Sequence, residues 1–337
     1  MTALRTTLIT MLTLALARGC IRLPTKPPPT VTEAPPTTEK PKVPHNVLVL
    51  GGVKIENAHV SIDPLSNDTI ADQDSLPVRV RGNVAAVYEG RQLLLAGYGY
   101  GPNVFNGTAF SPADQPEEVV REMGFSYKDR AGALLGSNFY SCGGLDDDNA
   151  ASVDCFVYSF ETSRWKKAPA LPKATGRGAM VSDGKSVYFF GGVPSAGGLE
   201  TKAVLKLDEA AGTWSELKEM PTGRQSHGAV YLEASGSVLV CGGRTNKVSV
   251  STCALYKIAE NAWTAAPSLW AKRFYFGLVE CEGVVYAVGG LEERRGRTHD
   301  TVERVEPQLE GGLGEWETLE DKLPRETTEA AVVCYPA

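Results

Sequence analysis

Basic side chains recur at one position of a repeating sequence pattern and are the chain's best candidates for binding chemistry. A guanidinium group can donate two parallel hydrogen bonds to a carboxylate, so such positions suit an acidic ligand. The recurring residues stand shortly before a pair of small apolar residues, and they are Arg81, Lys128, Arg224, Arg273 and Arg325. One further copy has Ala174 at this position, with Lys173 beside it and Arg177 three residues later, and another copy adds Arg130.

A second basic cluster lies in the segment LEERRGRTHD, residues 291–300, and supplies Arg294, Arg295 and Arg297. Because this cluster is not part of the repeat, it is the stronger candidate for contacting a ligand. The recurring basic residues also have a structural interpretation, in which they fix loops by pairing with nearby carboxylates such as Glu326, Asp129 or Glu293. Both interpretations remain open from the sequence.

Sequence patterns of dedicated catalytic and cofactor sites are not found. The four histidines lie in different copies of the repeat, without the spacing of metal ligands. The chain also has no HExxH, paired CxxC or P-loop motif, so we expect no metal, nucleotide or other cofactor. A formal net charge of −6 argues against general nucleic-acid binding.

The repeat itself is a short apolar run that ends in a pair of glycines. Clear copies read VLVLGG, FYSCGG, VYFFGG, VLVCGG and VYAVGG, and a weaker copy reads LLLAGYG. The first glycines of the copies lie 46 to 51 residues apart, at Gly51, Gly97, Gly143, Gly191, Gly242 and Gly289. Runs rich in β-branched and aromatic residues are typical of buried strands, and paired glycines permit backbone conformations with φ > 0. Regular spacing of this kind predicts a repeat architecture.

Large aromatic residues follow several copies at a fixed offset. Tyr158 precedes Trp165 by the same interval as Tyr256 precedes Trp263, and Trp214 and Trp316 mark two other copies. With the glycine pairs, these positions resemble the kelch repeat over residues 46–337, although the first two copies lack the tryptophan. The resemblance implies an all-β fold, a six-bladed β-propeller with one blade for each copy. It also implies that the recurring cations ring the mouth of a central channel.

The two ends of the repeat region predict how the ring closes. The first copy begins at a second strand, NVLVLGG, with no inner strand before it. The missing strand is found at the far end, in RETTEAAVVCY from Arg325. We therefore expect the C-terminal strand to complete blade one and leave no open sheet edge.

The region before the repeats predicts export from the cell. Residues 1–19 resemble a secretory signal peptide, with Arg5, an apolar core and a small-residue cleavage site, although an uncleaved anchor is the alternative. Residues 20–45 are rich in proline and threonine, which predicts an extended, disordered stalk that could be O-glycosylated or serve as a plain spacer. Two sequons, at Asn67 and Asn106, predict N-glycosylation of a secreted glycoprotein.

The cysteines occupy repeated positions. Cys142 and Cys155 stand at the ends of consecutive predicted strands, and Cys241 and Cys253 occupy the same positions two copies later. This duplication predicts two disulfides within blades, with buried thiols as the alternative. Cys281 and Cys334 could bridge the predicted inner strands of neighbouring blades, and Cys20 is left over.

Three functions remain compatible with the sequence. We favour a secreted, non-catalytic module that binds a protein partner, acidic or glycosylated, through the loops at the channel mouth. The second is a carbohydrate-active enzyme similar to sialic-acid mutarotases, with parts for Arg224, Arg273 and Glu329. The third is a glycan-binding lectin, in which Phe274, Tyr275 and Phe276 would stack on sugars, although packing is the simpler role for these rings. A closed pocket with convergent polar groups would favour an enzyme, and a broad exposed surface would favour a partner site.

Overall fold

The structure is a computed structural model that describes residues 45–50, 59–62, 69–70, 84–89, 92–97, 100–106, 128–293, 296–308 and 312–336. The chain divides into residues 1–42 and 43–337, and all described residues belong to the second unit. The predicted signal peptide, nearly all of the predicted stalk, and Asn67 lie outside the described residues. Asn106 is the last residue of a strand.

Four sheets contain four antiparallel strands each, paired in the order in which they occur in the sequence. The first has β7 (Ala131–Leu135), β8 (Asn138–Cys142), β9 (Cys155–Ser159) and β10 (Arg164–Ala168). The second has β11 (Ala179–Ser182), β12 (Val187–Phe190), β13 (Val204–Asp208) and β14 (Thr213–Glu216). The third has β15 (Gly228–Leu232), β16 (Ser237–Cys241), β19 (Cys253–Lys257) and β20 (Ala262–Ala266). The fourth has β21 (Gly277–Cys281), β22 (Val284–Val288), β23 (Val302–Val305) and β24 (Glu317–Thr318).

Two further sheets contain the early strands. One has β4 (Val84–Tyr88), β5 (Gln92–Gly97) and β6 (Tyr100–Asn106). The other joins β1 (His45–Leu50), β2 (His59–Ile62) and β3 (Thr69–Ile70) to the C-terminal strand β25 (Ala331–Pro336). A separate hairpin comprises β17 (Arg244–Thr245) and β18 (Val248–Ser249), and a short 3-10 helix, η2, covers Glu233–Ser235.

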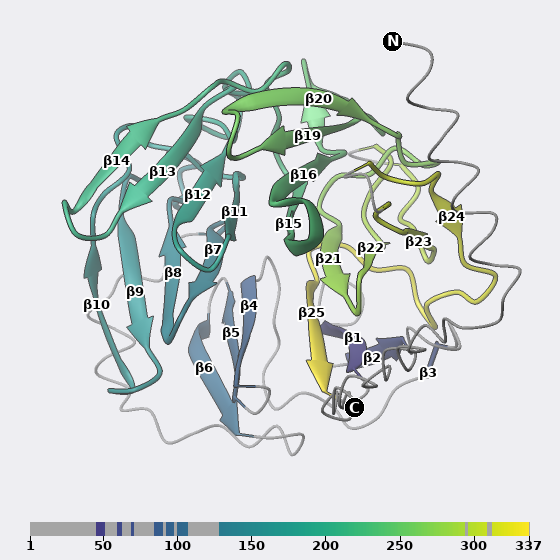
Figure 1. The fold of residues 1–337 in the computed structure, drawn as a ribbon, viewed down its shortest axis with the longest axis horizontal. Coiled ribbons are helices and arrows are strands. Elements are labelled where there is room, and N and C mark those ends of the chain that lie inside the picture. The colour runs from purple at the N-terminus through teal and green to yellow at the C-terminus, as the bar shows by residue number, and fades with distance from the viewer. Residues whose placement is uncertain are drawn as a thin grey trace, which may run out of the picture. The chain divides into compact units, whose positions relative to one another are not determined.

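The inner strands β4, β7, β11, β15, β21 and β25, one from each sheet, surround a common centre, which makes the fold an all-β propeller (Figure 1). Neighbouring inner strands contact one another in the order β4, β7, β11, β15, β21 and β25, and β25 contacts β4. No helix in the described part of the chain has the length and apolar character needed to cross a bilayer.

The C-terminal strand pairs with the first strand as the sequence predicts. β25 is antiparallel to β1 along its whole length, from Leu50 opposite Ala331 to His45 opposite Pro336. Residues distant in the sequence therefore share one sheet, and β1 gains the inner neighbour that its own repeat lacks.

Four glycine pairs in the described part of the chain join one sheet to the next through the backbone. Gly192 N–H donates to the carbonyl oxygen of Arg224 in the following blade at 2.7 Å. Gly191, which precedes it, has φ +61°, and a Cβ atom added there would lie 2.6 Å from the same Arg224 oxygen. Three other pairs repeat the joint: Gly144 to Thr175, Gly243 to Arg273 and Gly290 to Thr327. Only a residue without a side chain allows the two backbones to approach so closely.

The repeated aromatic residues fill the space within and between sheets. Trp165 lies opposite Tyr158 on neighbouring strands, with ring centroids 5.3 Å apart. Tyr256 and Trp263 form the equivalent pair at 5.0 Å, and both contact Phe190 of the preceding blade. Such packing explains why one sheet of this size requires neighbours.

All three predicted disulfides are present. Cys142–Cys155 and Cys241–Cys253 each join directly opposed residues of adjacent strands within one blade, with Cα atoms 4.1 Å apart. Cys281–Cys334 joins the inner strands β21 and β25, with Cα atoms 5.2 Å apart. The third bond therefore fastens the C-terminal strand to the blade beside it.

Gly242→Ala tests the glycine joint, with Gly236→Ala as its control. Both residues have φ near +60°, but an added Cβ at Gly242 meets the Arg273 oxygen at 2.6 Å, whereas Gly236 has nothing within 4 Å. The control should lose about 1–2 kcal/mol of unfolding free energy through backbone strain. Gly242→Ala should lose about 1–3 kcal/mol more through overpacking. Urea unfolding measures both, and equal losses would contradict the joint.

The disulfides should differ in their contribution to stability. Replacing Cys281 and Cys334 by serine opens a loop with a sequence separation of 53, against 13 for Cys142 and Cys155. Chain entropy then predicts losses of about 4 and about 3 kcal/mol respectively. Chemical unfolding of the two double variants gives the comparison, and a smaller loss for the longer loop would show that the bond does not restrain the C-terminal strand.

Candidate binding site at the channel mouth

A cavity of about 300 Å³ lies at the centre of the inner strands. Its walls are made of small and apolar residues, among them Ala131, Gly178, Ala229 and Val332. Polar residues line it at one end, which we call the channel mouth. The small apolar pairs of the repeat therefore form the wall of the channel. Larger side chains at these positions would fill the cavity.

Five residues at the channel mouth share an unusual backbone conformation, and we call them the rim residues. All have φ between +50° and +59°, and they are Asp129, Arg177, Ser226, Tyr275 and Glu329. Each occupies the same place in its repeat, just before an inner strand. Side chains other than glycine seldom adopt this conformation, so the surrounding structure must impose it.

A chain of backbone hydrogen bonds imposes that conformation. Arg177 N–H donates to the Asp129 carbonyl at 2.9 Å, and Ser226 N–H donates to the Arg177 carbonyl at 2.8 Å. Tyr275 N–H donates to Ser226, and Glu329 N–H to Tyr275, both at 3.0 Å. The rim is thus a second set of joints between blades, inside the first.

Rim side chains converge on one carboxylate. Arg177 Nε donates to Asp129 Oδ2 at 2.8 Å, and the two side chains are only 12% and 8% exposed. The Tyr275 hydroxyl donates to the same oxygen at 3.1 Å, and the Arg177 guanidinium lies 5.7 Å from the centre of the Tyr275 ring. A further bond leads outward, from Arg177 Nη1 to Gln225 Oε1 at 3.2 Å.

Tyr275 and Arg177 keep their protons near neutral pH. Burial and the Asp129 charge raise the pKa of Tyr275, so its hydroxyl stays protonated and donates. Burial alone would lower the pKa of Arg177, but Tyr275 and Asp129 more than offset that effect and raise it. The mouth therefore offers a fixed cation, a carboxylate and hydroxyl groups.

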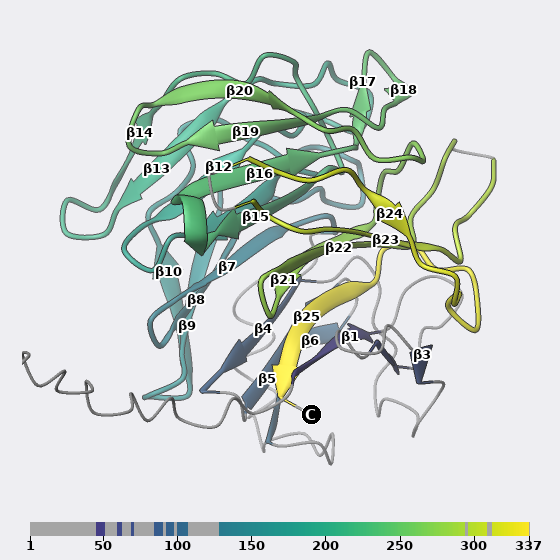
Figure 2. The same ribbon diagram turned by 45° about the vertical axis from the view of Figure 1, so that its right-hand side comes forward.

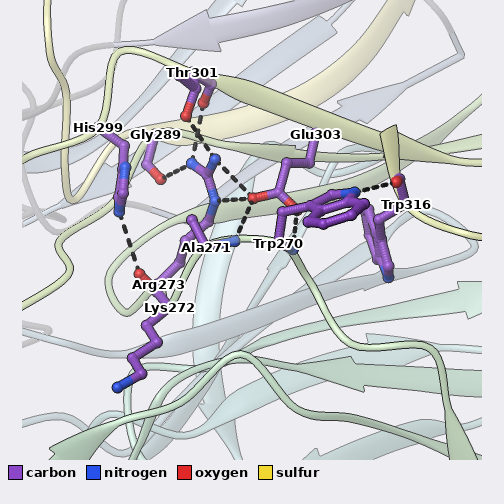
Figure 3. Close-up of polar contacts among 9 residues, drawn as sticks. All are labelled: Trp270, Ala271, Lys272, Arg273, Gly289, His299, Thr301, Glu303 and Trp316. Atoms are coloured by element: carbon purple, nitrogen blue, oxygen red, sulfur yellow. Dashed lines mark hydrogen bonds and ion pairs between the residues drawn. The ribbon is translucent and has the colours of Figure 1, made fainter. Parts of the chain in front are cut away.

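Two of the predicted ligand-binding arginines are buried inside blades. Arg224 is 5% exposed, and its Nη1 donates to the carbonyl oxygens of Gly242 at 2.7 Å and Thr252 at 2.8 Å. Arg273 is fully buried and makes the matching bonds to Gly289 and Thr301, with Nε also donating to Glu303 at 3.0 Å (Figure 3). Both arginines thus hold backbone within their own blade. Arg273 pairs with a carboxylate, as the structural interpretation expects, whereas the partners of Arg224 are carbonyl and hydroxyl oxygens.

The other proposed cations are not equivalent to these two. The glycine joints place Thr175 and Thr327 at the positions of Arg224 and Arg273, so Arg325 is two residues out of register, and its side chain is exposed. Lys128 instead pairs through its backbone with Leu145.

The remaining predicted residues are divided between the rim, the blade interior and the surface. Arg130 lines the cavity wall but donates to Ser141 and Asp154, whereas Arg177 is a rim residue. Arg297 is exposed on its loop, and Arg81, Arg294 and Arg295 lie outside the described residues. Phe274 and Phe276 are buried packing groups. The sequence suggests other roles for Asp129, Tyr275 and Glu329, and nothing in the sequence marks Ser226 as a rim residue.

His227 borders the cavity without a hydrogen-bond partner. It is 6% exposed, follows the rim residue Ser226, and neither ring nitrogen has a partner among the described residues. Burial and the charge of Arg224 lower its pKa to about 3, so the ring stays neutral. In the described part of the chain, no group of three or more His, Cys, Asp or Glu side chains is arranged to hold a metal.

Comparisons with known proteins agree with this architecture. The chain is 30% identical to Kelch-like protein 40 of Mus musculus over 148 residues, which is 43% of this chain and 22% of that protein. It is 25% identical to Beta-scruin of Limulus polyphemus over 205 residues, covering 57% of this chain and 22% of that protein. The chain spans about a quarter of the length of these curated relatives. No family model matches.

A solved structure shares the fold. The structure of YjhT superposes with a TM-score of 0.63 over 82% of this chain and 98% of that chain, at 15% sequence identity. With the glycine pairs, the Tyr–Trp pairs and the sheet order, the similarity to the curated relatives identifies the chain as a kelch-repeat β-propeller, and YjhT shows the shared fold.

His227 should make folding stability depend on pH. Its pKa is about 3 in the folded protein and about 6.5 in an unfolded chain, so only the unfolded chain takes up this proton between those values. Stability should therefore be fully present above pH 6.5 and fall by about 1.4 kcal/mol for each unit below it. His227→Phe, which copies Phe276 of the next blade, should remove this slope. Identical slopes in denaturant unfolding of the two proteins would contradict the assignment.

Proposed function

We propose that this chain is a secreted, non-catalytic binding module, a closed six-bladed propeller that holds a protein partner at the channel mouth. The observation that carries the proposal is the rim, where Asp129, Arg177 and Tyr275 converge on one cavity. Elsewhere in the described blades, the buried cations Arg224 and Arg273 are used by the fold.

The order of contacts supports a closed ring of six blades. The sheets of β4–β6 and of β25 with β1–β3 are the two blades beyond the four complete ones. Inner strands β25 and β4 contact each other, so no inner strand in the described chain is left without a neighbour on either side. Cys281–Cys334 would hold the closing strand in place.

Binding fits the rim better than acid–base catalysis does. A general acid or base works best with a pKa near the working pH. The pKa of Tyr275 is raised and that of His227 is lowered to about 3, so neither changes protonation near neutrality. Asp129 is occupied by Arg177 and Tyr275, which suits a positioned recognition group.

Three disulfides support export, because such bonds form and persist in oxidising compartments. The register of β1 against β25 shows which end of that sheet lies at the channel mouth. Leu50 and Ala331 lie at the channel-mouth end of their sheet, and His45 and Pro336 lie at the other end. The first described residue, His45, thus lies at the end of its sheet away from the mouth and does not cover the rim.

A small carbohydrate is the second candidate ligand. The cavity of about 300 Å³ is at the lower end of the range for small-molecule sites, and its polar mouth above apolar walls suits a sugar with a carboxylate. A sialic-acid mutarotase-like activity would require such a site. Binding of an acidic monosaccharide on a glycan array would favour this candidate.

Removing the rim ion pair should abolish partner binding. Asp129→Asn with Arg177→Gln neutralises both groups and leaves no unpaired buried charge. Chemical crosslinking in native extracellular fluid, followed by mass spectrometry, measures partner recovery, which should fall at least about tenfold. Arg164→Gln, an exposed arginine on β10, is the matched control and should bind normally. Undiminished recovery with the folded double variant would exclude the rim as the binding site.

A further inference from the structure

A continuous polar network runs from the rim to an exposed hairpin. Arg177 donates to Gln225 Oε1 at 3.2 Å, and Gln225 Nε2 donates to Glu200 Oε1 at 2.8 Å. The Glu200 carboxylate then accepts the backbone N–H groups of Asn246 at 3.1 Å and Lys247 at 3.3 Å. Two successive blades contribute to this line, the sheet of β11–β14 and the sheet of β15, β16, β19 and β20.

The hairpin β17–β18 is held in a strained turn by this network. Asn246 and Lys247 are its two turn residues, with φ +49° and +64°, which is the pattern of a type I′ turn. Such turns usually use glycine, so Lys247 must be held in place. The Glu200 carboxylate of the previous blade accepts the Lys247 N–H, and Arg244 Nη2 donates to the Lys247 carbonyl oxygen. Figure 2 shows β17 and β18 projecting beyond the ends of β16 and β19.

Two apolar side chains are exposed on the elements that the network fixes. Leu199 is 71% exposed beside Glu200, and Val248 is 58% exposed beside Lys247. Neither residue lines the cavity, so a small ligand confined to it would not explain them. Holding the hairpin in a strained turn and immobilising its side chains lowers the free energy of unfolding. We therefore expect these surface residues to have a role.

We propose that Leu199 and Val248 form the apolar half of the partner interface, next to the rim, and that the partner presents an apolar side chain flanked by carboxylates. This inference rests on the proposed function. Glu200 is engaged by backbone N–H groups, so the charged side chains left beside the two apolar residues are Lys202 and Lys247, both exposed and without an ion pair among the described residues. Pre-organisation by Glu200 reduces the entropy that the hairpin loses on binding.

A phage-displayed random dodecapeptide library, selected on the full folded protein, tests this interface. Enriched peptides should combine leucine-like residues with Asp or Glu. The double variant Leu199→Ser/Val248→Ser should raise their Kd at least tenfold, as should Asp129→Asn/Arg177→Gln. Val153→Ser, an exposed valine on the loop between β8 and β9, is the matched control and should leave Kd unchanged. Both serine variants change surface residues, and unaltered melting curves confirm that they fold.

The outcomes separate the inference from the proposed function. Peptides that lose affinity only in the Asp129/Arg177 variant would overturn the apolar interface and leave the rim site standing. Peptides indifferent to both double variants, or a library that yields no binder, would count against both. Glu200→Ala should weaken the peptides several-fold and speed amide exchange at Lys247, and an unchanged Kd would refute the role of the network in holding the hairpin.

Discussion

The propeller depends on a backbone hydrogen bond between consecutive blades. In the four glycine pairs that the structure describes, the second glycine donates to a carbonyl oxygen at the start of the next blade, as Gly192 does to Arg224. A side chain on the neighbouring glycine would collide with that oxygen, so the repeat must end in glycine. Arg224 has two structural roles. Its carbonyl oxygen accepts the bond from Gly192 of the previous blade, and its guanidinium donates to the Gly242 carbonyl within its own blade. Arg224 and Arg273 therefore join two sheets through the backbone, and their guanidinium groups are already bound within a blade, so they do not contact a ligand.

The two buried arginines show that a cation can be held by carbonyl dipoles. Arg273 has a carboxylate partner, Glu303, which also accepts the backbone N–H groups of Trp270 and Ala271 (Figure 3). Arg224 has only carbonyl and hydroxyl oxygens among its described partners, and burial lowers its pKa to about 10. It still carries its charge near neutral pH. Rim side chains, by contrast, extend from a backbone that is already fixed, which leaves their chemistry open to vary between blades.

Much of the fold was predictable because it depends on residue types that repeat. The geometry of a blade requires specific residue types at fixed places, and these are seen in the sequence as glycine pairs, Tyr–Trp pairs and duplicated cysteines. The pairing of β25 with β1 could be predicted because the first repeat lacks an inner strand. The site was less predictable. The sequence pattern assigns Arg325 to the position that Thr327 occupies in the structure, because a basic residue is expected there and Arg325 stands two residues earlier. The rim residues share a backbone conformation but no residue type, so neither spacing nor composition identifies Ser226 as one of them.

Amide hydrogen exchange of the native protein tests the central claim most directly. If the blades are joined through the glycine pairs, the amides of Gly144, Gly192, Gly243 and Gly290 should exchange only through global unfolding, as slowly as those of the central strand β16. Amides of the exposed Asp147–Asp148 loop should exchange quickly in the same experiment. Glycine amides that exchange as fast as this loop would contradict the account, because the blades would then be held by side-chain packing alone.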